Sequence, residues 1–320
     1  MGLKPQKLTE YAAMLFIWLA LVLLFGLLSR NFLSPSTFVI LANRIPSLAV
    51  ISAGMTLVLI IGGIDLSVGS LLGLCGSVLG VAMATYHVPF IAAVALALVI
   101  GLIAGTLNGL ISVCFGIPSF IVTLGMFEIA RGLAYLTTGS QTKYIGSAVE
   151  SLSAPIHGIG ISLAFLASIL IVAIGQLLLS RTIFGRYVIA IGANEIAVRF
   201  SGINPKPKKI AVFALLGLLS GLAGVFYTSR LGSADPNAGV GMELSAIAAV
   251  VIGGTSLMGG RGSVVNSFFG VLIIATLEAG LAQIGVSEPA KRVITGAVIV
   301  GAVVLDAWRR FLAEKHKSGL

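Results

Sequence analysis

Charged residues are scarce in this chain of 320 residues. Only 10% of its side chains are charged, whereas 58% are hydrophobic. A soluble domain cannot bury so much apolar surface, because its core saturates and the remainder would face water. A lipid bilayer solvates an apolar outer face, provided that the backbone satisfies its own hydrogen bonds. The composition therefore excludes an ordinary soluble protein and predicts a polytopic helical membrane protein.

Cysteine and histidine are almost absent as well. Cys75 and Cys114 lie inside apolar runs, so we expect both to be small buried residues, and no CxxC spacing exists. His87, His157 and His316 lie far apart in the sequence. We therefore expect neither a metal site nor a disulfide framework.

Motifs for nucleotide chemistry and catalysis are missing too. No P-loop occurs, and the segment 259–263 has an arginine and the wrong glycine spacing for phosphate binding. No Ser-His-Asp, paired-carboxylate or HExxH arrangement is seen. We expect no cofactor and no enzyme activity. Any transport must then draw its energy from an ion gradient or from another subunit.

Ten apolar segments fill the chain, and most are long enough to span a bilayer as helices. They cover approximately 11–28, 48–62, 66–84, 90–115, 118–138, 161–179, 210–228, 244–258, 263–283 and 293–308. The sequence thus predicts an all-α transmembrane bundle of about ten membrane segments, forming one transmembrane domain over 1–320. The first segment is expected to be an uncleaved helix, because no small-residue cleavage site follows it.

The basic residues predict the orientation of the bundle. With the N-terminus inside, 13 of the 20 lysines and arginines fall in the cytoplasm and 6 outside, while Arg131 lies within a helix. This asymmetry favours cytoplasmic N- and C-termini. It also means that the net charge of +9 indicates no nucleic-acid partner. The segments 48–62 and 66–84 could be two spans or a re-entrant pair, with the same later orientation.

Two short segments run into glycine-rich breaks. Ile61-Gly62-Gly63 recurs as Ile252-Gly253-Gly254, 191 positions later. Paired, glycine-broken segments in the two halves of a chain indicate a transport pathway. The candidate pathway residues are the polar groups beside the breaks, namely Asp65, Ser67, Thr255 and Ser256. Asp65 is also expected to cap a helix that begins near Leu66, by accepting the N–H of Ser67 or Val68.

Few other ionisable groups lie in apolar segments. Glu128 and Arg131 are spaced i, i+3 on one expected helix, so we expect them to pair. Glu278 and Asp306 lie near segment ends. This scarcity argues against a proton-coupled secondary transporter, which stays as the alternative function.

The largest hydrophilic segment covers about 180–209 and is expected to be cytoplasmic. Asn194 can cap a helix of two turns that Gly202 ends. Glu195 and Arg199 can pair within it, because they are spaced i, i+4. The helix could dock onto a soluble partner or lie on lipid headgroups.

Four motifs together resemble the ribose-type permease subunits of ATP-binding-cassette (ABC) importers for monosaccharides. They are Gly62–Ser70, Pro118–Gly125, Gly192–Ile203 and Ala248–Gly262, and the resemblance covers about 10–308. It implies a multi-pass protein of the bacterial cytoplasmic (inner) membrane that works with a second permease copy or close paralogue. It also implies two further partners, an ABC ATPase and a periplasmic or lipid-anchored sugar-binding protein.

The resemblance assigns the cytoplasmic segment to ATPase coupling. The coupling residues would be Asn194, Glu195, Ala197, Arg199 and Gly202. The segment departs from the general importer pattern, because Ile196 replaces the first alanine and the glycine comes one place later. The cargo stays open among pentoses, hexoses, inositols and furanose-like signalling molecules.

Overall fold

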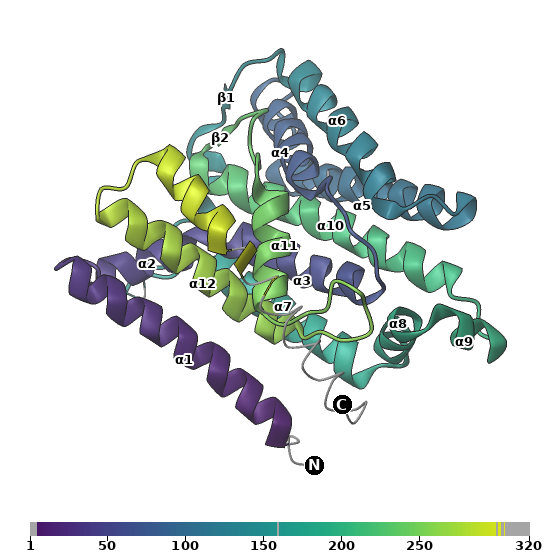
Figure 1. Cartoon of the computed structure of the whole chain (residues 1–320). Coiled ribbons are helices and arrows are strands. Elements are labelled where there is room, and N and C mark those ends of the chain that lie inside the picture. The colour runs from purple at the N-terminus through teal and green to yellow at the C-terminus, as the bar shows by residue number, and fades with distance from the viewer. Residues whose placement is uncertain (1–4, 159, 299, 302–303, 305–320) are drawn as a thin grey trace.

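The computed structural model describes residues 5–158, 160–298, 300–301 and 304. The chain folds into a bundle of helices, with one two-residue strand pair, β1 (Lys143–Tyr144) and β2 (Ser233–Ala234). Figure 1 shows this strand pair at the end of the bundle opposite to the short helices α8 and α9. The expected all-α bundle is thus confirmed in outline. Asp306 and His316 lie outside the described residues.

The helices follow the predicted apolar segments closely. In chain order they are α1 (Pro5–Leu28), α2 (Pro35–Arg44), α3 (Pro46–Ile60), α4 (Val68–Ala84), α5 (Phe90–Phe115), α6 (Ser119–Thr138), η1 (Gly146–Ala148), η2 (Glu150–Leu152), α7 (Leu163–Arg181), α8 (Ile183–Ala193), α9 (Glu195–Phe200), α10 (Lys206–Leu231), α11 (Met242–Ile252) and α12 (Val264–Gln283). A further helix covers 288–298. The sequence did not predict α2, which Ser34 caps, nor α8 within the hydrophilic segment.

Six of the described helices could cross a membrane, judged by length and apolar composition. They are α1, α5, α6, α7, α10 and α12, and the bent pair α2–α3 would add a seventh. At 17 and 11 residues, α4 and α11 are shorter apolar helices. The last expected segment, 293–308, lies partly outside the described residues. The polytopic class is therefore shown, whereas the number ten and the orientation stay predictions.

Helix α3 forms the centre of the core. All 15 of its residues are buried, and α7, α10, α11 and α12 pack around it. The outer helices instead expose large apolar side chains, such as Phe16, Ile91 and Leu136. In Figure 1, α1 and α6 lie at opposite edges of the bundle. An apolar core inside an apolar outer face is the arrangement expected of a protein that lipid surrounds.

Glycine lets α5 and α10 approach each other closely. A Cβ at Gly101 would lie 2.3 Å from the carbonyl oxygen of Gly217, and one at Gly217 would lie 2.2 Å from that of Gly101. Small residues are what permit backbones to approach in lipid, where packing replaces the hydrophobic effect as the driving force.

Cys75 is buried as expected, but Cys114 on α5 is exposed. The prediction for Cys114 was wrong because an apolar run does not distinguish a core-facing side chain from one that faces lipid.

Candidate functional site

Helix α3 ends at the first glycine-rich break in a Schellman motif. Gly62 has a φ of +75°, which glycine adopts without the steric cost that a Cβ would bring. Its N–H donates to the carbonyl of Leu59, and that of Gly63 donates to the carbonyl of Val58, both at 2.9 Å. The motif satisfies carbonyls that the helix end leaves without partners.

Helix α11 ends at the second break in the same way. Gly254 has a φ of +81°, and its N–H donates to the carbonyl of Val251 at 2.8 Å. The N–H of Thr255 donates to the carbonyl of Val250 at 3.2 Å. The left-handed glycines are thus Gly62 and Gly254, which lie 192 positions apart. The identical Ile-Gly-Gly sequences lie 191 positions apart. The two breaks therefore have the same backbone geometry, but the second is offset by one residue from the alignment of the Ile-Gly-Gly sequences.

Asp65 holds the chain between the first break and α4. Its Oδ1 accepts the N–H of Ser67 at 2.8 Å and the hydroxyl of Ser67 at 2.6 Å. Its Oδ2 accepts the side-chain amide of Asn108 on α5 at 3.4 Å, and that amide also donates to the Ser67 hydroxyl at 3.0 Å. The expected bond to the Ser67 N–H is confirmed. The helix itself begins at Val68, with Ser67 as the N-cap residue.

Two hydroxyls of α6 satisfy the extended backbone beside Asp65. The N–H of Ile64 donates to Ser119 Oγ at 2.9 Å, and the N–H of Leu66 donates to Thr123 Oγ1 at 3.1 Å. Sequence reasoning missed Ser119, Thr123 and Asn108 as partners of the break. The first two belong to the motif Pro118–Gly125, whose hydroxyls were the available signal.

Thr255 and Ser256 begin a compact loop after the second break. The N–H of Ser256 donates to the carbonyl of Arg261 at 3.0 Å, and Ser256 Oγ accepts the N–H of Met258 at 3.2 Å. All four candidate pathway residues are buried, including Asp65 and Ser67. None of them lines either of the two pockets described below.

The short helix α9 forms where the sequence predicted it. Asn194 Oδ1 accepts the N–H of Ala197 at 2.9 Å, which confirms the N-cap. Gly202, with a φ of +78°, ends the helix, and its N–H donates to the carbonyl of Arg199. Val198 faces inward, whereas Ile196 and Phe200 are 67% and 88% exposed. The helix therefore presents apolar side chains and Ala197 at the α9 end of the bundle.

Glu195 ties α9 to α10. Its carboxylate accepts from Arg199 at 2.5 Å, as expected from their spacing, and from Lys209 of α10 at 2.9 Å. Partial burial raises the pKa of Glu195, but the hydrogen bonds and charges of Lys209 and Arg199 together outweigh burial, so the pKa lies below its ordinary value of 4.5.

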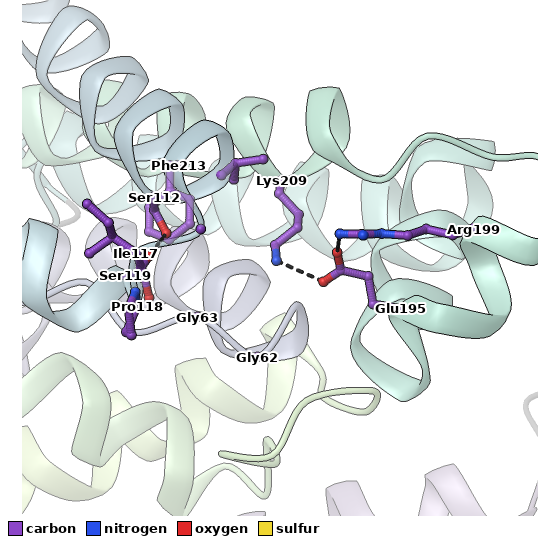
Figure 2. Close-up of a pocket in the computed structure, with 12 residues that line it drawn as sticks. Gly62, Gly63, Ser112, Ile117, Pro118, Ser119, Glu195, Arg199, Lys209 and Phe213 are labelled. Carbon is purple, nitrogen blue, oxygen red and sulfur yellow. Dashed lines mark hydrogen bonds and ion pairs between the residues drawn. The ribbon is translucent and has the colours of Figure 1, made fainter.

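A pocket of about 330 Å³ lies between α9 and the first break (Figure 2). Figure 2 shows Lys209 and Arg199 converging on the Glu195 carboxylate at one side of this pocket. Gly62 and Gly63 lie beneath them, and the α5–α6 connection closes the other side with Ser112, Ile117, Pro118 and Ser119. The pocket thus brings the coupling segment and the first break to one place.

A larger pocket of about 570 Å³ lies near the other end, between α3, α10, α11, α12 and the helix that covers 288–298. Arg44 pairs with Glu278 at 3.3 Å across it. Arg230 lies over the ring of Tyr227, with its Cζ 5.1 Å from the ring centroid. The volume of this larger pocket falls within the range of small-molecule sites, roughly 300–1,000 Å³.

Arg131 does not pair with Glu128. It donates instead to the backbone carbonyls of Pro236 and Ala238, at 2.5 and 2.9 Å, and no ion pair to Glu128 forms within the described chain. Arg131 is 9% exposed, whereas Glu128 is exposed. The expected pair was wrong because the loop before α11 offers desolvated carbonyls to the longer side chain.

Comparison with known proteins gives one family. Residues 37–303 match the family described as the permease component of the branched-chain amino acid transport system. The chain is 39% identical to the ribose import permease protein RbsC of Escherichia coli (strain K12) over 90% of this chain and 91% of that protein. It is 41% identical to RbsC of Bacillus subtilis (strain 168), over 94% and 92%.

A second group of relatives imports a signalling molecule. The autoinducer 2 import system permease protein LsrC of Yersinia pseudotuberculosis serotype O:1b (strain IP 31758) is 33% identical, over 97% of this chain and 88% of that protein. No solved structure matches the chain at a significant level.

Proposed function

We propose that this chain carries a monosaccharide or related polyol. It belongs to the family of permease components described for branched-chain amino acid transport systems. It is a non-catalytic permease subunit of an ABC importer in the bacterial inner membrane. The observation that carries the choice of cargo is the 39–41% identity to ribose permeases along nine-tenths of both chains.

We infer three partners for this subunit. A second permease copy would complete the pathway, an ABC ATPase would dock onto α9, and an extracytoplasmic binding protein would deliver the sugar. The exposed apolar side chains of α9 and its position in the longest hydrophilic segment support the docking role of Asn194, Glu195, Ala197, Arg199 and Gly202.

The pathway is proposed to run beside the two breaks, at the interface between the permease copies. The matched Schellman ends of α3 and α11 support this placement. Asp65 and Ser67 would fix the shape of the first break, and Thr255 and Ser256 that of the second. Since all four are buried, they are expected to act mainly by holding the backbone.

The test is uptake by the complete importer in proteoliposomes. We expect uptake of radiolabelled ribose to require the permease, the ATPase, ATP inside the vesicle and the binding protein outside. A panel of pentoses, hexoses, inositols and autoinducer 2 would then identify the preferred cargo. Uptake driven by an ion gradient without ATP would support the secondary transporter instead and overturn the proposal.

A further inference from the structure

Three segments far apart in sequence meet backbone to backbone at the α9 end of the bundle. The carbonyl of Ile60, in the last turn of α3, accepts the N–H of Gly260 in the second break loop at 2.9 Å. This carbonyl belongs to the final turn of a helix, which has no partner for it within the helix. The second break thus satisfies the buried end of the helix that leads into the first.

The end of α8 packs onto this hydrogen bond. A Cβ at Gly192 would lie 1.7 Å from the carbonyl oxygen of Ile60 and 2.6 Å from the nitrogen of Gly260. A Cβ at Gly259 would lie 2.9 Å from the carbonyl oxygen of Gly192. Only glycine at position 192 allows the three backbones to touch, because any side chain would occupy the position of the carbonyl.

The contact extends to the residue that follows. A Cβ at Gly260 would lie 2.9 Å from Cα and 3.2 Å from Cβ of Ala193. Ala193 immediately precedes Asn194, the N-cap of α9. Helix α9, the proposed docking helix, therefore begins two residues after the contact. We call the group Ile60, Gly192, Ala193, Gly259 and Gly260 the glycine junction.

Gly192, Gly259 and Gly260 are half-buried and Ala193 is exposed, so the contact lies at the edge of the core. It transmits displacement because the three backbones leave no room for a Cβ between them, so a segment pushed toward the others must displace them. The Glu195–Lys209 pair also links α9 to α10, and it is partly exposed. A partly exposed ion pair contributes little, because water screens its charges. The backbone contact is thus the stiffer connection.

We propose that the glycine junction moves as one body and carries the displacement of α9 to both breaks at once. This inference rests on the proposed function, because it requires an ATPase that moves α9. It adds that a single contact links α9 to the end of α3 and to the loop that follows α11. The junction residues are positioning residues, and Gly192 is the one that the contact requires.

The first test compares alanine substitutions at three helical glycines in the complete importer. Gly192→Ala is expected to leave ATPase binding intact while lowering ribose uptake per ATP hydrolysed by about tenfold, a usual size for coupling between sites. Gly132→Ala is the matched control, because a Cβ there meets no atom within 4 Å, and it should behave as the wild type. Gly217→Ala is the destabilised control, since its Cβ would meet the Gly101 carbonyl at 2.2 Å, and it should lower the amount of inserted permease.

Normal uptake per ATP in an inserted Gly192→Ala permease would overturn the proposal. Loss of ATPase binding in this variant would also count against it, because the junction would then shape the docking surface instead. If the wild-type complex itself shows no ATP-dependent uptake, the failure belongs to the proposed function and not to the junction.

The second test locks the junction and does not depend on the folding of Gly192→Ala. Ala193→Cys and Gly260→Cys would be combined in a Cys114→Ser background, since Cys114 is exposed. The 3.2 Å separation of the two Cβ positions is a few tenths of an ångström below the roughly 3.5–4.5 Å of a disulfide, so the two segments must shift slightly for the bond to form. If the junction moves as one body, the oxidised pair should transport as well as the reduced pair. Transport that is lost on oxidation and restored by reduction would show that its segments move apart, and would overturn the proposal.

Discussion

At the scale of single residues, the breaks are held by polar groups that satisfy one another. Asp65 receives three donors from Ser67 and Asn108, and hydroxyls of α6 receive the neighbouring N–H groups. Buried polar groups without partners are costly at membrane depth, where no water replaces the lost bond. The polar side chains here therefore have an architectural role that can be tested separately from transport.

Asp65→Ala is expected to destabilise the permease more than Asp65→Asn. Alanine leaves the N–H and the hydroxyl of Ser67 without an acceptor, at a cost of about 1–3 kcal/mol for each buried group. The Asn108 amide loses its bond to Asp65 but keeps Ser67 Oγ. Asparagine keeps one oxygen for Ser67, and the unpartnered Oδ1 of Asn108 could accept its amide after a flip of Asn108. Thermal unfolding in detergent together with ribose uptake would measure the difference. Wild-type behaviour of both variants would remove Asp65 from the account of the break.

Glu195 should make the α9–α10 link insensitive to pH around neutrality. Because its folded-state pKa lies below 4.5, the stabilisation from its pairs is complete above the unfolded-state value and is lost as pH falls through the folded-state value. Glu195→Gln should therefore speed hydrogen exchange in α9 at neutral pH, and the difference from wild type should vanish in acid. A difference that persists after Glu195 is protonated would show that its charge is not the cause.

At the scale of elements, the two Schellman ends and α9 are related. Helices α3, α11 and α9 each end at a left-handed glycine. The end of α3 meets the end of α8 and the loop after α11 at the glycine junction. Short helices with fixed ends can move as rigid pieces about their glycine hinges. The exposed face of α9 is then the surface on which a partner would act.

Gly202→Trp should weaken the ATPase complex or uncouple it, because a bulky side chain would stand beside the exposed face of α9. A Cβ at Gly202 meets no atom within 4 Å, so the permease itself has space for the change. The φ of +78° strains any L-residue by about 1–2 kcal/mol, and Gly202→Ala shares that strain without the bulk. ATPase pull-down and vesicle uptake should fall for tryptophan and not for alanine. Wild-type ATPase binding and uptake in both the tryptophan and the alanine variant would mean that α9 lies on the membrane surface.

At the scale of the whole molecule, the bundle has two distinct ends. One end carries α8 and α9, and the other carries β1 and β2 (Figure 1). The smaller pocket is lined by Glu195 and Arg199 of α9, and the larger one by Tyr227 and Arg230, in the last turns of α10 before β2. The distribution of basic residues predicts that the first end is cytoplasmic. The two ends would then face the ATPase and the binding protein, respectively.

Cysteine labelling in cells should confirm this orientation. In a Cys114→Ser background, single cysteines near Lys208 should react only with reagents that cross the membrane, whereas those near Lys143 and Asn237 should react with impermeant reagents. A site near His316, outside the described residues, is expected to behave like Lys208. Labelling near Lys208 from the periplasmic side would contradict the orientation.

The sequence by itself determined the membrane class, most helix bounds and the two ends of α9. Apolar length, N-caps and left-handed glycines are local properties, so α5 matches its predicted range and Asn194 caps α9 as expected. The four motifs likewise identified the family before any fold was known.

Only the tertiary structure decided which groups meet. Arg131 turned to the carbonyls of Pro236 and Ala238, more than 100 positions along the chain, rather than to Glu128 one helical turn away. Cys114 is exposed rather than buried. The two breaks align through the left-handed glycines Gly62 and Gly254 rather than through the identical Ile-Gly-Gly sequences. The glycine junction left no trace in the sequence beyond three glycines among 40, because a backbone contact is set by how helices pack and not by side-chain type.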